Sequence, residues 1–133
     1  MSNNLLWEDV KSELVKASRL EFISQACDAI VEKTPGVPDI TFYNLESVEP
    51  ENIVIWGVYA NPNIALDFYV KFEYDSENIS RRPNLVSVWI QQSGRKYPCG
   101  SINADDEGCG GVSLTNCILA RLDAGAHMME YIN

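Results

Sequence analysis

The sequence is poor in the side chains that most catalytic and metal sites require. It contains one histidine, His127, and four cysteines, none of them in Cys-x-x-Cys spacing. Cys117 and His127 stand ten residues apart in a segment with a helical pattern. That spacing separates them by about 15 Å along a helix axis, too far for two ligands of one ion. We therefore expect no metal site, no cofactor and no catalytic residue. Enzymatic activity stays undecided, with the balance toward a protein that is not an enzyme.

Long apolar runs are also missing. No apolar stretch approaches the ~20 residues that cross a bilayer. The N-terminal segment, Met-Ser-Asn-Asn-Leu-Leu-Trp-Glu-Asp, lacks the basic and apolar regions of a signal peptide. These absences predict a cytoplasmic protein that does not enter membranes. In a reducing compartment its cysteines are expected to be free thiols.

Positive charge is scarce, since 10 Lys and Arg residues face 19 Asp and Glu residues and the net charge is −9. Residues 36–75 carry seven acidic residues and one basic residue, whereas residues 76–102 are net basic. An acidic field repels nucleic acid and attracts basic surfaces. We therefore expect a protein partner with a basic surface. A DNA mimic is disfavoured because basic residues interrupt the acidic ones, and the simpler alternative is acidity that serves solubility alone.

The clearest pattern in the chain runs from Ile64 to Tyr74. Every second residue of this segment is apolar, namely Ile64, Leu66, Phe68, Val70, Phe72 and Tyr74. A period of two places this set on one face of a β-strand and the residues between them on the other face. The segment predicts a central strand of an antiparallel sheet that is covered on one side only.

Helical patterns flank the strands. One continuous helix is expected up to Thr34, with an apolar stripe of Val10, Leu14, Ala17, Leu20, Ile23, Cys27 and Ile30. A second is expected at 113–131. Strands are expected at 40–44, 53–59, 64–74, 85–91 and, as a short fifth one, 97–102, with an acidic loop at 46–51. The sequence thus predicts a single α+β domain over 1–133. We expect a two-layer sandwich whose antiparallel sheet has four or five strands, with both helices on one face and the order α-β-β-β-β-(β)-α.

The uncovered sheet face is the first candidate site. If the alternation holds, it carries Asp67, Tyr69, Lys71, Glu73, Trp89 and Gln91. Exposed Tyr and Trp among charges are typical anchors of protein interfaces. Two alternatives stay open: another segment covers both aromatic rings, or they pack only against each other as a cross-strand pair.

The second candidate is a glycine-rich loop that leads into the C-terminal helix. Its residues are Cys109, Gly110, Gly111 and Ser113, and free N–H groups at a helix N-terminus bind anions. The loop matches neither the P-loop nor the dinucleotide-binding motif, and the acidic residues before it oppose a phosphate. The simpler interpretation is a connection that lets the helix fold back onto the sheet.

Two functions follow from these candidates. The leading hypothesis is a small acidic protein–protein interaction module, in the manner of inhibitors, immunity proteins, anti-defence proteins or chaperones. It would bind a basic partner surface through the uncovered sheet face and the acidic loops at 46–51 and 73–77. The basis is a shared physical profile and no shared motif. The alternative is a small-ligand or phosphate-binding domain, with or without enzymatic activity, that uses the glycine-rich loop. A second copy of the chain, paired through the long N-terminal helix, is a further alternative partner.

Overall fold

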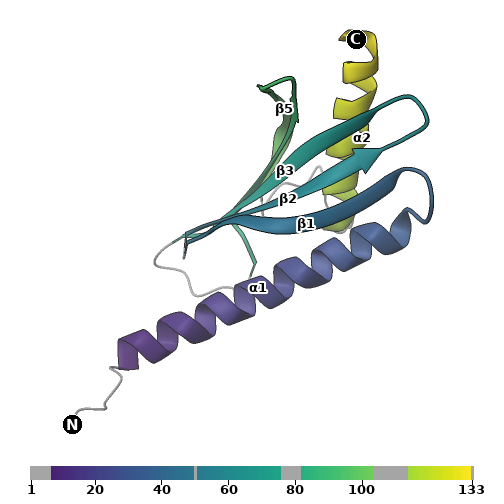
Figure 1. Ribbon diagram of the computed structural model, residues 1–133. Helices are drawn as coiled ribbons and strands as arrows, with labels where there is room; N and C mark the ends of the chain where they lie inside the picture. The colour runs from purple at the N-terminus through teal and green to yellow at the C-terminus, as the bar shows by residue number, and fades with distance from the viewer. Residues whose placement is uncertain (1–6, 50, 76–81, 104–113, 133) are drawn as a thin grey trace.

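Two helices pack on one face of an open five-stranded antiparallel sheet (Figure 1). This computed structural model describes residues 7–49, 51–75, 82–103 and 114–132. Helix α1 (Trp7–Lys33) comes first and helix α2 (Leu114–Ile132) last. The strands are β1 (Asp39–Val48), β2 (Asn52–Ala60), β3 (Ala65–Glu73), β4 (Leu85–Gln92) and β5 (Arg95–Asn103). They lie side by side in chain order. The predicted α+β architecture is confirmed, with the fifth strand present.

Strand β3 forms the centre of the sheet, as its alternating pattern predicts. Leu66, Phe68, Val70 and Phe72 are buried, and the residues that alternate with them face the opposite side. The hairpin that joins β2 to β3 is closed by Asn61, whose Oδ1 accepts hydrogen bonds from the backbone N–H groups of Asn63 (2.8 Å) and Ile64 (2.9 Å). This Asx turn sets Ala60 opposite Ala65 and thereby fixes the register of the pair.

The core lies between the sheet and the helices. Helix α2 packs on β4 and β5, and α1 packs on β1 and α2. Gly125 in α2 permits the close approach of helix and sheet, because a Cβ at this position would lie 2.7 Å from Cδ1 of Ile90 and would also collide with Sγ of Cys99. The helices contribute buried side chains that include Ile23, Cys27, Ile30, Ile118, Leu122, Ala126 and Met129.

The N-terminal half of α1 departs from its predicted role. Leu14 was expected to face the sheet but is 62% exposed, and Figure 1 shows this part of α1 running past the sheet. A helix of 27 residues is about 40 Å long, so its N-terminal part extends beyond the sheet (Figure 1). Arg19, expected off the stripe, is only 3% exposed and lies over the ring of Tyr74, 4.2 Å from its centroid.

Strand β1 is longer than expected and includes part of the predicted acidic loop. Its register against β2 shifts twice, so that Tyr43 and Glu46 are extra residues in β-bulges. The bulges let β1 follow β2 as far as Val48, paired with Ile53. The prediction of a loop that begins at Glu46 is therefore wrong, because pairing with a long apolar neighbour outweighs the polar composition of residues 46–48.

The expectation of four free thiols is also wrong. Cys27 and Cys99 are free, but Cys117 takes part in a disulfide whose partner lies outside the described residues. Disulfides are rare in the reducing cytosol, so the cytoplasmic location stays a prediction. In the part of the chain that the structure describes, neither helix has the length and hydropathy needed to cross a membrane.

Candidate partner-binding surface

Four aromatic side chains cross the uncovered face of the sheet, which we call the outer face. Trp56 of β2 stands directly opposite Tyr69 of β3, and Tyr69 stands opposite Trp89 of β4. Tyr43, in the first bulge of β1, contacts Trp56 with ring centroids 4.9 Å apart. Tyr43, Trp56, Tyr69 and Trp89 thus form an aromatic row across four neighbouring strands.

The two residues that the sequence singled out pack against each other. The rings of Tyr69 and Trp89 are stacked, with centroids 5.4 Å apart and planes 11° apart. Lys96 of β5 places its Nζ over the Trp89 ring, 5.6 Å from the centroid. Both rings are partly buried, so the face is covered by its own side chains and by no described helix. The cross-strand pair foreseen as an alternative does form, and the partner-binding role of these residues stays a prediction.

The indole Nε1 of Trp89 is a polar atom without a visible function in the fold. It is shielded from solvent and donates no hydrogen bond to any described residue. An unsatisfied buried donor costs about 1–3 kcal/mol. Native structures contain few such atoms, which makes this position unusual on the outer face.

The other predicted residues also lie on the outer face. Asp67 stands opposite Gln91, and Lys71 and Glu73 form an ion pair of 3.8 Å within β3. Burial, and then the charges of Glu46 and Asp67, raise the pKa of the Tyr69 phenol. The register therefore brings together all six residues that the sequence named for this face.

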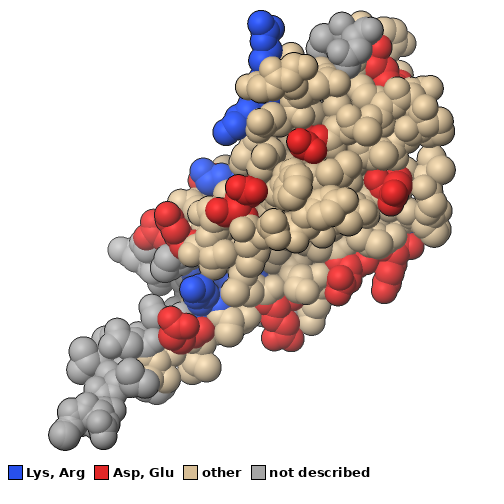
Figure 2. Space-filling view, in the orientation of Figure 1, with Lys and Arg blue, Asp and Glu red and all other residues tan. Residues whose placement is uncertain are grey.

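Figure 2 shows the molecule from the side on which the strands lie in front of α2. Uncharged atoms fill much of the middle of this view. Basic groups occur only along its left side, whereas acidic groups also occur in the middle and on the right. The picture thus shows a largely uncharged centre that also contains acidic groups.

Sequence reasoning missed two residues of this surface, Tyr43 and Trp56, and it assigned Glu46 to an acidic loop instead of to β1. Trp56 lies in an apolar run whose two faces look alike, so the pattern of β2 alone does not assign a face to it. The tight turn at Asn61 carried the missing signal, because a register with Ala60 opposite Ala65 also places Trp56 opposite Tyr69. Tyr43 left no such signal, since it stands in a bulge.

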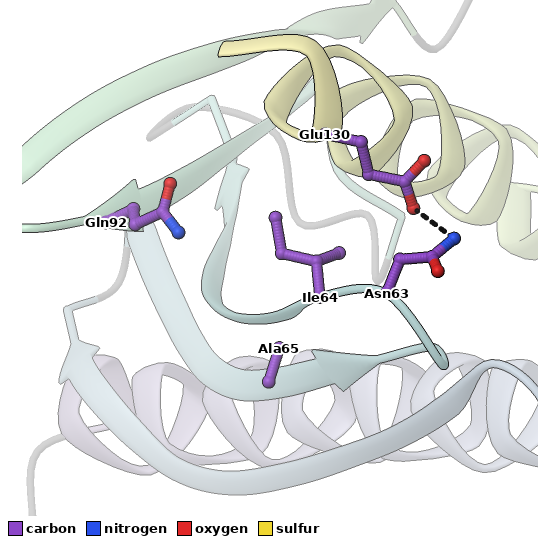
Figure 3. A pocket seen from close by; sticks show the side chains of 5 residues that line it. All are labelled: Asn63, Ile64, Ala65, Gln92 and Glu130. Carbon is purple, nitrogen blue, oxygen red and sulfur yellow. Dashed lines mark hydrogen bonds between the residues drawn. The ribbon is translucent and has the colours of Figure 1, made fainter. Parts of the chain in front are cut away.

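A shallow hollow of about 650 Å³ lies between the β2–β3 turn and the end of α2 (Figure 3). Asn63 and Glu130 point toward each other across it, joined by a hydrogen bond of 3.5 Å from Nδ2 to Oε1. Asn61 donates a second bond of 3.1 Å to the same oxygen. These contacts tie the turn to α2, and they occupy the carboxylate of Glu130. Within the described ranges no group of three potential metal ligands occurs.

A second hollow, of about 250 Å³, lies between α1 and the first turn of α2. Its polar lining residues are Gln25, Arg82 and Thr115. The glycine-rich candidate site of Cys109, Gly110, Gly111 and Ser113 lies outside the described residues. Of the region around this loop, the structure describes α2 from Leu114 onward.

The chain matches no protein-family model, no curated protein and no solved structure. Its function has to be inferred from the chemistry of the described residues. The larger hollow offers little that binds or reacts, whereas the aromatic row joins large ring surfaces, nearby carboxylates and an unsatisfied indole donor. The outer face is therefore the candidate functional site.

Proposed function

We propose that the protein is an interaction module that binds the basic surface of a partner protein through the outer face. The observation that carries the proposal is the aromatic row, a line of Tyr and Trp side chains on a face that no described helix covers. Tyr and Trp are the commonest hot-spot residues of interfaces together with Arg. An inhibitor, an immunity protein, an anti-defence protein or a chaperone would use such a face in the same way.

The edges of the sheet favour the face over strand addition as the mode of binding. Edge strand β1 has two bulges, at Tyr43 and Glu46. Edge strand β5 has an irregular register beside Trp89, and Pro98 there lacks an N–H group to donate. Bulges and proline are the devices that keep other strands from pairing with an edge. A partner thus meets side chains on the face more readily than backbone at the edges.

Charge supports a basic partner. The chain is net −9, and on the outer face Lys71 is already paired with Glu73. The side-chain carboxylates of Glu46 and Asp67, in contrast, form no ion pair or hydrogen bond with any described residue. Carboxylates of this kind speed the approach of a cationic surface and lose that effect in salt.

The test is capture of the partner from a lysate of the native host, with the wild-type chain and two variants of the row, Tyr69→Ala and Trp89→Ala. The matched control is Tyr131→Ala, which removes an aromatic ring that is 80% exposed on α2. We expect the control to retain a specific partner and the row variants to lose it by at least about tenfold, the scale of one hot-spot residue.

Circular dichroism at the capture temperature verifies that each variant is folded. Folded row variants that retain the partner would refute the proposal. Loss of the partner in Tyr131→Ala alone would place the interface on α2 and refute it as well.

Anion binding is the second candidate, and the hollow beside the first turn of α2 favours it because Arg82 lines that hollow. A small phosphorylated compound would there meet a guanidinium and the positive end of a helix. Thermal-shift measurements with inorganic phosphate and nucleotides test it. Stabilisation by one of these compounds that disappears in Arg82→Gln is the expected result. The absence of any shift in the wild-type chain would exclude this function.

A further inference from the structure

The aromatic row consists of two separate ring pairs. Tyr43 contacts Trp56, and Tyr69 stacks on Trp89. Trp56 and Tyr69 stand directly opposite each other on β2 and β3, where Cβ atoms are about 5 Å apart. Even so, no ring contact joins these two side chains. The ring contact of Trp56 is with Tyr43 and that of Tyr69 is with Trp89, so the row is interrupted between β2 and β3.

Two carboxylates without a cation flank this interruption. Asp67 precedes Tyr69 by two residues on the same face of β3, and Glu46 stands in the second bulge of β1. Both charges act on the Tyr69 phenol and help to raise its pKa, after the larger effect of burial. Neither carboxylate has an ion-pair or hydrogen-bond partner among the described residues. The middle of the row therefore combines aromatic surface with uncompensated negative charge.

At two other aromatic rings of the molecule, a cationic side chain of the chain itself lies over the ring. Arg19 lies over the ring of Tyr74 at 4.2 Å, and Lys96 lies over the ring of Trp89 at 5.6 Å. Tyr69 has two carboxylates near it, yet no described cation lies over its ring. The described residues of the outer face thus leave the ring of Tyr69 without a cation, and a partner can supply one.

We propose that the outer face binds an arginine side chain of the partner, stacked on the rings at the middle of the aromatic row and held by Glu46 and Asp67. Guanidinium is planar, stacks on aromatic rings and binds carboxylates through paired N–H groups, whereas ammonium is a compact, strongly hydrated charge that does neither as well. The proposal rests on the proposed function and adds to it the residue that the partner must present.

The first experiment uses the full chain and two probes, a short Gly-Arg repeat peptide and a Gly-Lys repeat peptide of equal length and charge. Titration calorimetry gives affinity, and the indole N–H signals of Trp56 and Trp89 report the location. The variants are Glu46→Gln and Asp67→Asn, which keep shape and remove charge. The matched control is Glu32→Gln, an exposed acid on α1.

We expect the arginine peptide to bind more tightly than the lysine peptide and to shift both indole signals. Each site variant should weaken this binding by about tenfold, as for one lost charge-assisted hydrogen bond. The control should change it by less than about twofold, because an exposed distant charge is screened. Equal affinity for the two peptides, or equal losses in control and site variants, would overturn the proposal.

Partner capture with the same variants separates this proposal from the proposed function. If Trp89→Ala loses the captured partner but Glu46→Gln and Asp67→Asn keep it fully, the face is an interface and the arginine site is wrong. If the arginine peptide binds as expected but row variants retain the partner, the arginine site stands and the proposed interface is wrong.

Discussion

Replacement of Gly125 by alanine tests the close packing of α2 on the sheet. In an open helix this change stabilises by about 1 kcal/mol, because glycine is the poorer helix former. Here the added methyl group would lie 2.7 Å from Cδ1 of Ile90 and would also collide with Sγ of Cys99. Overpacking of a core costs about 1–3 kcal/mol. We therefore expect Gly125→Ala to destabilise the protein by a net ~1 kcal/mol, after subtraction of the propensity gain.

Urea denaturation measures this free energy of unfolding, and a mutant cycle identifies its cause. Cys99→Ala and Ile90→Val each remove one atom that the methyl group meets. In a background that carries both substitutions, Gly125→Ala should lower the free energy of unfolding by less, or even raise it, with a coupling energy of at least about 1 kcal/mol. The control is Ala124→Gly on the exposed side of α2, which should destabilise by about 1 kcal/mol through propensity alone. A stabilising Gly125→Ala in the wild-type background would refute the packing described here.

Three further predictions concern the row and the cysteines. A double-mutant cycle of Tyr69→Ala and Trp89→Ala, measured by urea denaturation, should give a coupling of about 0.5–1.5 kcal/mol for the stacked rings, and zero coupling would contradict the stack. Burial raises the pKa of the Cys27 thiol from 9.0 to about 12, so the unfolded chain ionises first. The part of the free energy of unfolding that depends on this thiol should be complete below pH 9.0 and be lost as the pH rises toward 12. The total free energy of unfolding should therefore decline less steeply over this range in Cys27→Val, and an equal decline in the variant would assign the effect to other groups. In denaturant, a thiol reagent should find two reactive thiols before reduction and four after it, and four before reduction would disprove the disulfide.

The amino-acid sequence by itself determined which face of each central strand is buried. In β3 and β4 the period of two is nearly perfect, so one register satisfies the core and any slip by one residue would expose it. That is why Asp67, Tyr69, Lys71, Glu73, Trp89 and Gln91 could be assigned to the outer face without a structure. The same argument placed both helices on the apolar side, since an apolar stripe has to be buried.

Only the tertiary structure decided what completes that face. Tyr43 and Glu46 reach it because bulges change the alternation of β1, and a bulge depends on pairing with β2 rather than on local pattern. Trp56 joins the row through the register of the hairpin. The exposure of Leu14 and the burial of Arg19 likewise follow from where α1 crosses the sheet. Local sequence specifies the direction of a side chain along its own strand, whereas neighbours across strands are set by how the whole chain packs.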